Sequence, residues 1–203
     1  MEILTAYIRK NSSAEKCLKA RYISLDIQEI LSVIRRRKNY FNNGEFKHLD
    51  LQNTCLKGAD LSEANLEGAD LSEANLEGAD LFEANLEGVD LSEANLKRAN
   101  LEGADLFEAN LERADLSEAN LKRANLAWAN LRDARLQGAK LRDANLEEAL
   151  LKGAEIWNAN LEGIKELKVD QLSNVKTLYN AKLDDAYLLP LKEKYPALFD
   201  EPK

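Results

Sequence analysis

The sequence predicts an all-β solenoid, in which short extended segments coil around a narrow apolar core. Leucine recurs at every fifth position from Leu51 to Leu161, and only Ile156 interrupts this series of 23 centres. Alanine stands two residues before each centre from Ala59 onward, with Val89 as the exception. Self-similarity at a fixed period indicates a repeat architecture before any local propensity is considered.

The five-residue period excludes the two regular alternatives. On an α-helix, a step of five leaves about 140° between successive leucines, so they would spiral around the cylinder and form no buried stripe. In a straight strand, an odd step sends successive leucines to opposite faces. A short extended piece that bends every five residues avoids both problems. It keeps the alanine and leucine of each unit inward, while the polar residue between them points outward or into the bend.

Runs such as Ala59-Asp60-Leu61 and Ala64-Asn65-Leu66 carry the repeated pattern Ala-(Asp/Asn)-Leu-x-x. In this pattern the chain resembles the pentapeptide-repeat family, over residues 51–161. The resemblance implies a right-handed quadrilateral β-helix with four pentapeptides per coil. The 23 units then give nearly six coils, a rod on the order of 28 Å long at about 4.8 Å per coil.

Both ends of such a rod need caps, because an open solenoid exposes apolar core and unpaired backbone. We expect an N-terminal helical cap over residues 1–45, the β-helix over residues 46–165, and a C-terminal helical cap and tail over residues 166–203. The N-terminal region resembles the helical lead-in of some bacterial, especially cyanobacterial, members of the family.

Apolar spacing places the helices of the two caps. Residues 3–8 predict a short helix, and residues 27–34 predict a second helix whose N-cap is Ser24. After the repeat, the spacing of Leu172, Val175, Leu178 and Tyr179 predicts a helix capped by Asp170. We expect a terminal helix that ends near Lys194, followed by a segment over residues 195–199 that packs back on the rod.

The sequence offers little material for catalysis. His48 is the only histidine, which excludes a metal cluster built on several histidines and leaves at most one site for a serine–histidine pair. No glycine-rich phosphate-binding motif occurs. We therefore predict a protein that is not an enzyme and that has no cofactor and no metal ion.

The two cysteines, Cys17 and Cys55, lie in different regions and predict no disulfide scaffold. Cys55 occupies the polar position of its unit, where we interpret it as a tolerated small residue rather than a redox group. This cysteine usage predicts a reducing, cytoplasmic setting. No apolar run approaches the ~20 residues that a membrane span requires.

Charge is the pattern most relevant to function. The net charge is −8, but residues 57–95 alone carry eleven acidic residues against Lys57. One interpretation is mimicry of duplex DNA, which carries one negative charge per roughly 1.7 Å of axis. The other is a solvated outer surface, in which carboxylates such as Asp60 and Asp90 bond to nearby backbone in the turns.

If four units make a coil, residues twenty apart lie on adjacent coils. This register predicts ion pairs between Glu93 and Arg113 and between Arg113 and Asp133. It also predicts pairs of Glu77 with Lys97 and of Glu102 with Lys122, each of which contributes at most about 1 kcal/mol when exposed. The same register stacks like charges in the early coils, where Glu63 meets Glu83 and Glu67 meets Glu87.

We interpret the chain as a structural scaffold that presents the faces of its β-helix to an unidentified protein partner. The prediction includes no direct nucleic-acid binding and no membrane association, and it allows a homodimer. The alternative is a DNA-mimicking inhibitor or protector of a type II topoisomerase. The candidate interaction surface consists of Glu63, Glu67, Glu73, Glu83, Glu87, Trp128 and Leu150.

Overall fold

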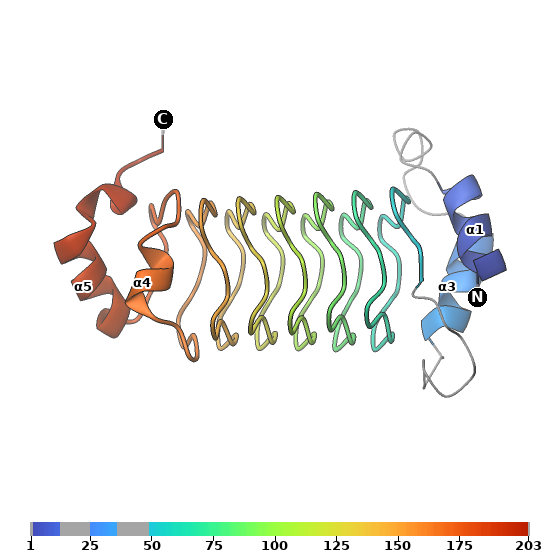
Figure 1. Cartoon of the computed structure of the whole chain (residues 1–203), viewed down its shortest axis with the longest axis horizontal. Helices are drawn as coiled ribbons and strands as arrows, with labels where there is room; N and C mark the ends of the chain where they lie inside the picture. Colours follow the sequence, from blue (N-terminus) through green and yellow to red (C-terminus); the bar gives the residue numbers. More distant parts are fainter. Residues whose placement is uncertain (1, 13–24, 36–48, 203) are drawn as a thin grey trace.

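The protein is a rod of stacked coils with helices at both ends (Figure 1). The computed structural model describes residues 2–12, 25–35 and 49–202. One end carries the helices α1 (Glu2–Asn11) and α3 (Leu25–Arg35). The other end carries α4 (Val169–Leu172), α5 (Asp185–Lys194) and the 3-10 helix η2 (Pro196–Phe199).

Parallel backbone bridges fix the register of the coils. They pair residues twenty apart, from Asp50 with Asp70 to Asn145 with Lys165. Because each unit has five residues, four units make one coil. Only the polar residue of each unit sits in a bridge before the chain turns, so the coils are joined by many isolated bridges rather than by long strands.

Each corner is a tight turn of two residues. In a representative corner, the Leu61 carbonyl accepts a hydrogen bond from the Ala64 amide at 3.1 Å, and the second central residue, Glu63, has φ +57°. This is the geometry of a type II turn. Glycine takes that second position at several corners, and at Gly153 a Cβ would lie 2.0 Å from Asp133 Oδ1, so the Asp133 side chain would have to move to admit a larger residue.

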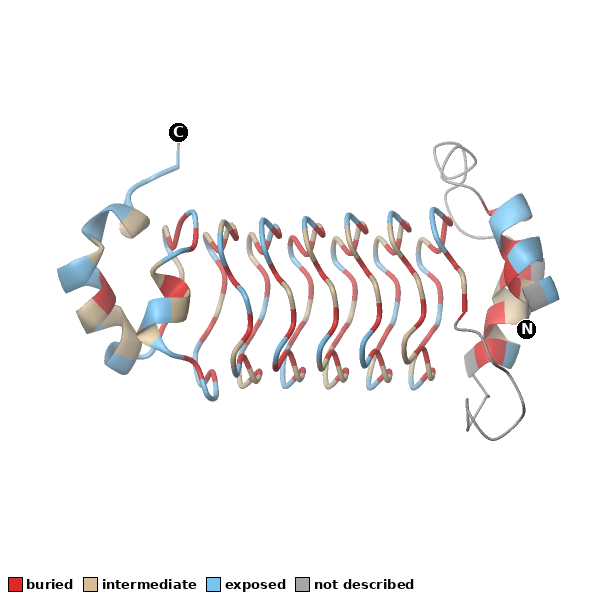
Figure 2. Cartoon of the chain, viewed as in Figure 1, coloured by how far each residue is buried: buried red, intermediate tan, exposed pale blue. Residues whose placement is uncertain are grey.

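The alanines and leucines of the repeat line the inside of the rod, as the period predicts (Figure 2). At the middle of the rod, Ala99 and Leu101 are 0% exposed. One continuous apolar core runs from the helices at the N-terminal end, through every coil, to Leu191 in α5.

The polar position between alanine and leucine supports the corner that follows it. Oδ1 of Asn75 accepts the Glu77 backbone N–H at 3.0 Å, and Oδ1 of Asp90 accepts the Ser92 N–H at 2.9 Å. The same bond recurs at most Asp and Asn positions of the repeat. The prediction that these side chains bond to backbone in the turns is confirmed.

Glutamine side chains close the coil at both ends. Gln171 Nε2 donates to the carbonyls of Leu146 and Ala149 at 3.0 and 3.1 Å, and Gln171 Oε1 accepts the Lys168 N–H. At the other end, Gln28 in α3 donates to the Asp60 carbonyl and accepts from the Asp60 N–H. These amides satisfy edge groups that would otherwise lack a partner coil.

The predicted helix over residues 172–179 is wrong. The helix α4 has only four residues, its N-cap is Lys168, and Asp170 lies inside it. Beyond α4 the chain rejoins the coil, because Glu155 bridges Thr177 and Asn160 bridges Lys182. These bridges join residues 22 apart instead of twenty, so the last coil contains two extra residues. The five-residue period resumes after them, but out of phase with the earlier repeats. Its centres are the buried leucines Leu178 and Leu183.

The other helix predictions are confirmed where the structure describes them. The helices α1 and α3 cover the predicted ranges, and α5 ends at Lys194. The segment that follows packs on the rod, since the Leu198 carbonyl accepts the Leu178 N–H at 2.6 Å. The predicted N-cap Ser24 lies outside the described residues, as does His48.

The cysteine interpretation needs correction. Cys55 is disulfide-bonded and only 4% exposed, so it is not merely a tolerated small residue. The other cysteine of the chain, Cys17, lies outside the described residues. The inference of a reducing compartment from unpaired cysteines therefore loses its basis. No helix in residues 2–12, 25–35 or 49–202 is long and apolar enough to cross a membrane.

Replacement of Leu101 by Asp tests the inward assignment of the centre position. The variant places a charge in a dry core without a partner, so we expect the free energy of unfolding to fall by more than about 4 kcal/mol. Ser92→Lys, at a corner, should change it by less than about 0.5 kcal/mol. Denaturant unfolding of both variants measures this, and a stable Leu101→Asp protein would contradict the core assignment.

Candidate interaction surface

The register of twenty residues sorts the surface of the rod into four columns. We call one of them the acidic column, and it consists of residues 64–68, 84–88, 104–108, 124–128 and 144–148. These segments lie in the same position of five successive coils, as the bridges from Asn65 through Asn85, Asp105 and Asn125 to Asn145 show. Each segment supplies one polar position and the two-residue corner that follows it.

The acidic column has no lysine and no arginine, unlike the other three columns. Its acidic residues are Glu67, Glu87, Asp105, Glu108, Glu147 and Glu148. Over the same five coils, each of the other columns holds at least two basic residues. The net negative charge of this column thus continues along one side of the rod beyond residues 57–95, the segment with the largest acidic excess in the sequence.

The ion pairs of the described residues separate the acidic column from the opposite column but not from the next one. Within residues 2–12, 25–35 and 49–202, only Glu148 of the acidic column has an ion-pair partner, Lys168. In the column opposite, Glu77 is held between Lys57 at 2.7 Å and Arg98. In the next column, over the same coils, only Glu93 of six carboxylates has an ion-pair partner within these ranges. The acidic column therefore differs from its neighbour in lacking lysine and arginine, not in lacking ion pairs.

The structure brings most of the predicted surface residues to this side. Glu67, Glu87 and Trp128 belong to the acidic column, and Glu63 and Glu83 lie in the corner that precedes it. The remaining two predicted residues lie elsewhere. Glu73 is in the corner of the next column, and Leu150 is on that column's face, in a bridge with Asn130.

Trp128 is the most unusual residue of the column. Its indole is 53% exposed, and its backbone has φ +61°. A bulky residue rarely adopts the left-handed region, and glycine takes this position in the first two coils of the same column. Glu108 and Glu148 hold the same position of this column at φ +55° and +49°, so the conformation belongs to the corner, and the exposure of the indole is what sets Trp128 apart. Leu150, 41% exposed, bridges Asn130, which is two residues beyond Trp128.

Sequence reasoning missed Asp105, Glu108 and Glu147. It added charge along the chain, and these three residues lie in segments that also contain lysine and arginine. If the charges of residues twenty apart in the sequence are summed, these three residues fall into the same acidic column. Phe107 is a second aromatic residue of the acidic column. It occupies the corner one coil before Trp128 and is half-buried.

The predicted ion pairs do join adjacent coils, but some of them use a different basic residue from the one predicted. Glu93 and Arg113 pair at 3.2 Å as expected. Glu102 instead meets Arg123 at 2.6 Å rather than Lys122. In two of the predicted pairs, the partner is the arginine one residue after the expected lysine. Arg98 pairs with Glu77 and Arg123 pairs with Glu102, and each arginine is the second residue of its corner. From there, the longer guanidinium side chain reaches back to the preceding coil.

Few carboxylates have a pKa that departs clearly from its ordinary value. The hydrogen bond from Lys57 lowers the pKa of Glu77, and Arg98 adds to the effect. The Asn120 amide and Arg123 together lower the pKa of Glu102, and Glu148 raises the pKa of Lys168. Burial opposes ionisation of Asp70, but hydrogen bonds from Ser72 and Gln52 outweigh it and lower the pKa of Asp70.

The described residues contain no group of three or more histidine, cysteine, aspartate or glutamate side chains that could hold a metal ion. Serine hydroxyls lie beside carboxylates, as Ser117 Oγ does beside Asp115 Oδ1 at 2.5 Å, but these bonds belong to the corners of the repeat. What the surface offers is charge, shape and an exposed aromatic side chain. These are the properties of a binding surface.

The profile of the Pentapeptide repeats family matches residues 59–98, 99–138 and 129–165, which together exceed half of the chain. The chain is a pentapeptide repeat protein. No curated protein sequence matches it.

Solved pentapeptide repeat proteins resemble this one over most of their own length. One from the thylakoid lumen of Arabidopsis thaliana is 35% identical with a TM-score of 0.52, over 56% of this chain and 81% of that protein. One from the cyanobacterium Cyanothece is 32% identical with a TM-score of 0.51, over 62% of this chain and 91% of that protein. The fluoroquinolone resistance protein QnrB1 is 20% identical with a TM-score of 0.42, over 74% of this chain and 83% of that protein. This last likeness is too distant to carry a functional argument.

The ion pairs of Glu77 predict a defined pH dependence. Because the folded state lowers the pKa of Glu77, its stabilising contribution is complete above the ordinary value of 4.5 and is lost as pH falls through the lowered pKa. Glu77→Gln should lower stability at pH 7 by about 0.5–1 kcal/mol. The difference from wild type in Tm should shrink below pH 4.5.

Thermal unfolding of both proteins across this pH range measures the effect. Glu67→Gln serves as the control, since Glu67 has no ion pair within the described parts of the chain. If the Tm difference of Glu77→Gln persisted unchanged in acid, ionisation of Glu77 would not be its source.

Proposed function

We propose that this pentapeptide repeat protein is a non-enzymatic scaffold that binds a basic protein partner through its acidic column. The observation that carries the proposal is a continuous column of five coils with six carboxylates and no lysine or arginine. An uncompensated field of one sign attracts surfaces of the opposite sign and accelerates their association.

The length of the column suits an extended contact. From Glu67 to Glu147 the column rises over four coil spacings, which is about 19 Å at roughly 4.8 Å per coil. Trp128 lies within this span, with Phe107 one coil away. Exposed aromatic residues near the centre of a contact supply much of the binding energy in protein interfaces, and the surrounding charges supply orientation and rate.

The alternative, a DNA-mimicking inhibitor or protector of a type II topoisomerase, has weaker support. Duplex DNA carries charge along both strands around its axis. Here the net negative charge is greatest in one of four columns, because only that column has no basic residue, while the opposite column includes Lys57, Lys97, Arg98 and Arg135. A gyrase supercoiling assay separates the two proposals. Inhibition at micromolar protein would favour mimicry, and none would remove it.

A homodimer remains part of the proposal, with one restriction. Two acidic columns would repel each other, so self-association would use another side of the rod. The cytoplasm is the compartment that the sequence predicts. The disulfide of Cys55 argues against a reducing compartment, so a measurement of the thiol state in the source cell decides this point.

Substitutions in the acidic column should abolish partner binding without loss of the fold. Trp128→Gly removes the exposed indole, and glycine adopts positive φ without strain, so the Tm should stay equal or rise. Glu108→Lys reverses charge at an exposed corner. In pulldowns from the source cell, wild-type protein should capture a basic protein that neither variant retains. Added salt should weaken the capture.

Glu118→Lys is the matched control, because Glu118 is an equally exposed corner carboxylate in the opposite column. Equal capture by wild type, Trp128→Gly and Glu108→Lys would contradict the role of the column. Loss of capture with Glu118→Lys alone would move the binding surface to the opposite side.

A further inference from the structure

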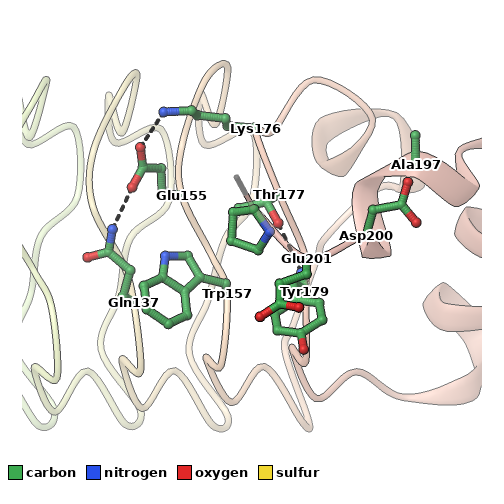
Figure 3. A pocket seen from close by; sticks show the side chains of 10 residues that line it. Gln137, Glu155, Trp157, Lys176, Thr177, Tyr179, Ala197, Asp200 and Glu201 are labelled. Atoms are coloured by element: carbon green, nitrogen blue, oxygen red, sulfur yellow. Dashed lines mark hydrogen bonds and ion pairs between the residues drawn. The ribbon is translucent and has the colours of Figure 1, made fainter.

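A cavity of about 610 Å³ lies where the last coils meet the C-terminal tail (Figure 3). It opens on the column opposite the acidic column, so it is separate from the surface described above. One wall consists of coil residues, among them Trp157 and Tyr179, and the other consists of residues 200–202 of the tail. Its volume falls in the range of small-molecule and side-chain binding pockets.

Two aromatic side chains of adjacent coils form the inner wall. Trp157 and Tyr179 hold the same corner position in successive coils, and the Asn158 N–H donates to the Tyr179 carbonyl at 2.8 Å. The two backbones are therefore about one coil spacing, roughly 4.8 Å, apart. Both side chains are half-buried, and Figure 3 shows them side by side along the rod.

The charges on the coil side neutralise each other. Glu155 Oε1 pairs with Lys176 Nζ at 2.5 Å, and Glu155 Oε2 accepts a hydrogen bond from Gln137 Nε2 at 2.5 Å. This network holds the Glu155 carboxylate against the wall (Figure 3). It leaves no excess charge on the coil side of the cavity.

The tail contributes two carboxylates that are not neutralised. Asp200 and Glu201 are exposed, and neither has an ion pair within residues 49–202. The tail that carries them is fixed to the last coil, because the Leu198 carbonyl accepts hydrogen bonds from the Leu178 N–H and from Thr177 Oγ1 at 2.6 and 3.5 Å. Figure 3 shows the Asp200 carboxylate directed away from Trp157 and Glu201 beside Tyr179, so Glu201 supplies the excess negative charge next to the aromatic wall.

We propose that this cavity binds an arginine side chain of a partner polypeptide. A guanidinium is planar, stacks on an aromatic face and pairs with a carboxylate at its edge, and the cavity offers both partners in its aromatic wall and Glu201. A lysine ammonium provides charge but no planar face. An anionic group would be repelled, and a neutral aromatic group would leave Glu201 without a counter-charge. The proposal does not depend on the acidic column.

The fluorescence of Trp157 tests this proposal directly. The chain has two tryptophans, so Trp128→Phe leaves Trp157 as the only indole. The probe is the blocked tripeptide acetyl-Gly-Arg-Gly-amide, and its lysine and citrulline analogues are the comparisons. We expect a saturable fluorescence change with the arginine peptide, weaker binding of the lysine peptide, and no saturable change with citrulline, which is planar but uncharged.

A variant of the tail separates charge pairing from adventitious stacking. In the Trp128→Phe background, Glu201→Gln should weaken binding of the arginine peptide about two- to fivefold, as expected for the loss of one exposed ion pair. Glu193→Gln, which neutralises an exposed residue of α5 outside the cavity, should leave affinity unchanged.

Three results would overturn the proposal. They are no saturable change with the arginine peptide, equal binding of the citrulline peptide, and unchanged affinity in the tail variant with an unchanged Tm. A failure of the acidic column to capture a partner would leave all three measurements intact, so the two proposals can fail separately.

Discussion

The pairing of each coil with the next at a spacing of twenty residues is the constraint on which the rest of this structure depends. The apolar core requires alanine and leucine inward in every unit, and the corners require a residue that tolerates positive φ. Together they leave the chain no freedom to slip, because a shift of one residue would turn a centre leucine outward. The coil is thus determined by residues that never contact a partner.

The polar position illustrates how this constraint shapes the sequence. Asp and Asn both offer an Oδ1 that accepts the backbone N–H of the next corner, so either residue satisfies the turn. Asn has an additional role, because its amide reaches the preceding coil, as Asn100 Nδ2 does to Asp80 Oδ1 at 2.9 Å. An aspartate stacked on an aspartate, such as Asp80 beside Asp60, lacks that bond. Asn at this position therefore relieves repulsion between coils, which fits its prevalence after the early coils.

Much of the fold could be predicted from the sequence, because the period alone excludes a helix and a straight strand and fixes the inward residues. The resumed coil around Leu178 and Leu183 could not be predicted, since an insertion of two residues disguises the period as helical spacing. The acidic column was visible in part. Glu67, Glu87 and Trp128 could be selected singly, but Asp105, Glu108 and Glu147 emerge only when charge is added across coils. The cavity beside Trp157 depends on how the tail folds back, and no periodicity encodes that contact.

An engineered disulfide tests the central claim, the register of four units per coil, most directly. In a Cys17→Ser, Cys55→Ser background, Glu67→Cys with Glu87→Cys joins equivalent corners of adjacent coils, whose spacing of about 4.8 Å suits a disulfide. Glu67→Cys with Phe82→Cys, fifteen residues apart, places the second cysteine at a different corner. Under mild oxidation, the account predicts loss of both thiols in the first pair and retention of both in the second. A disulfide in the second pair but not the first would contradict the register and the columns that follow from it.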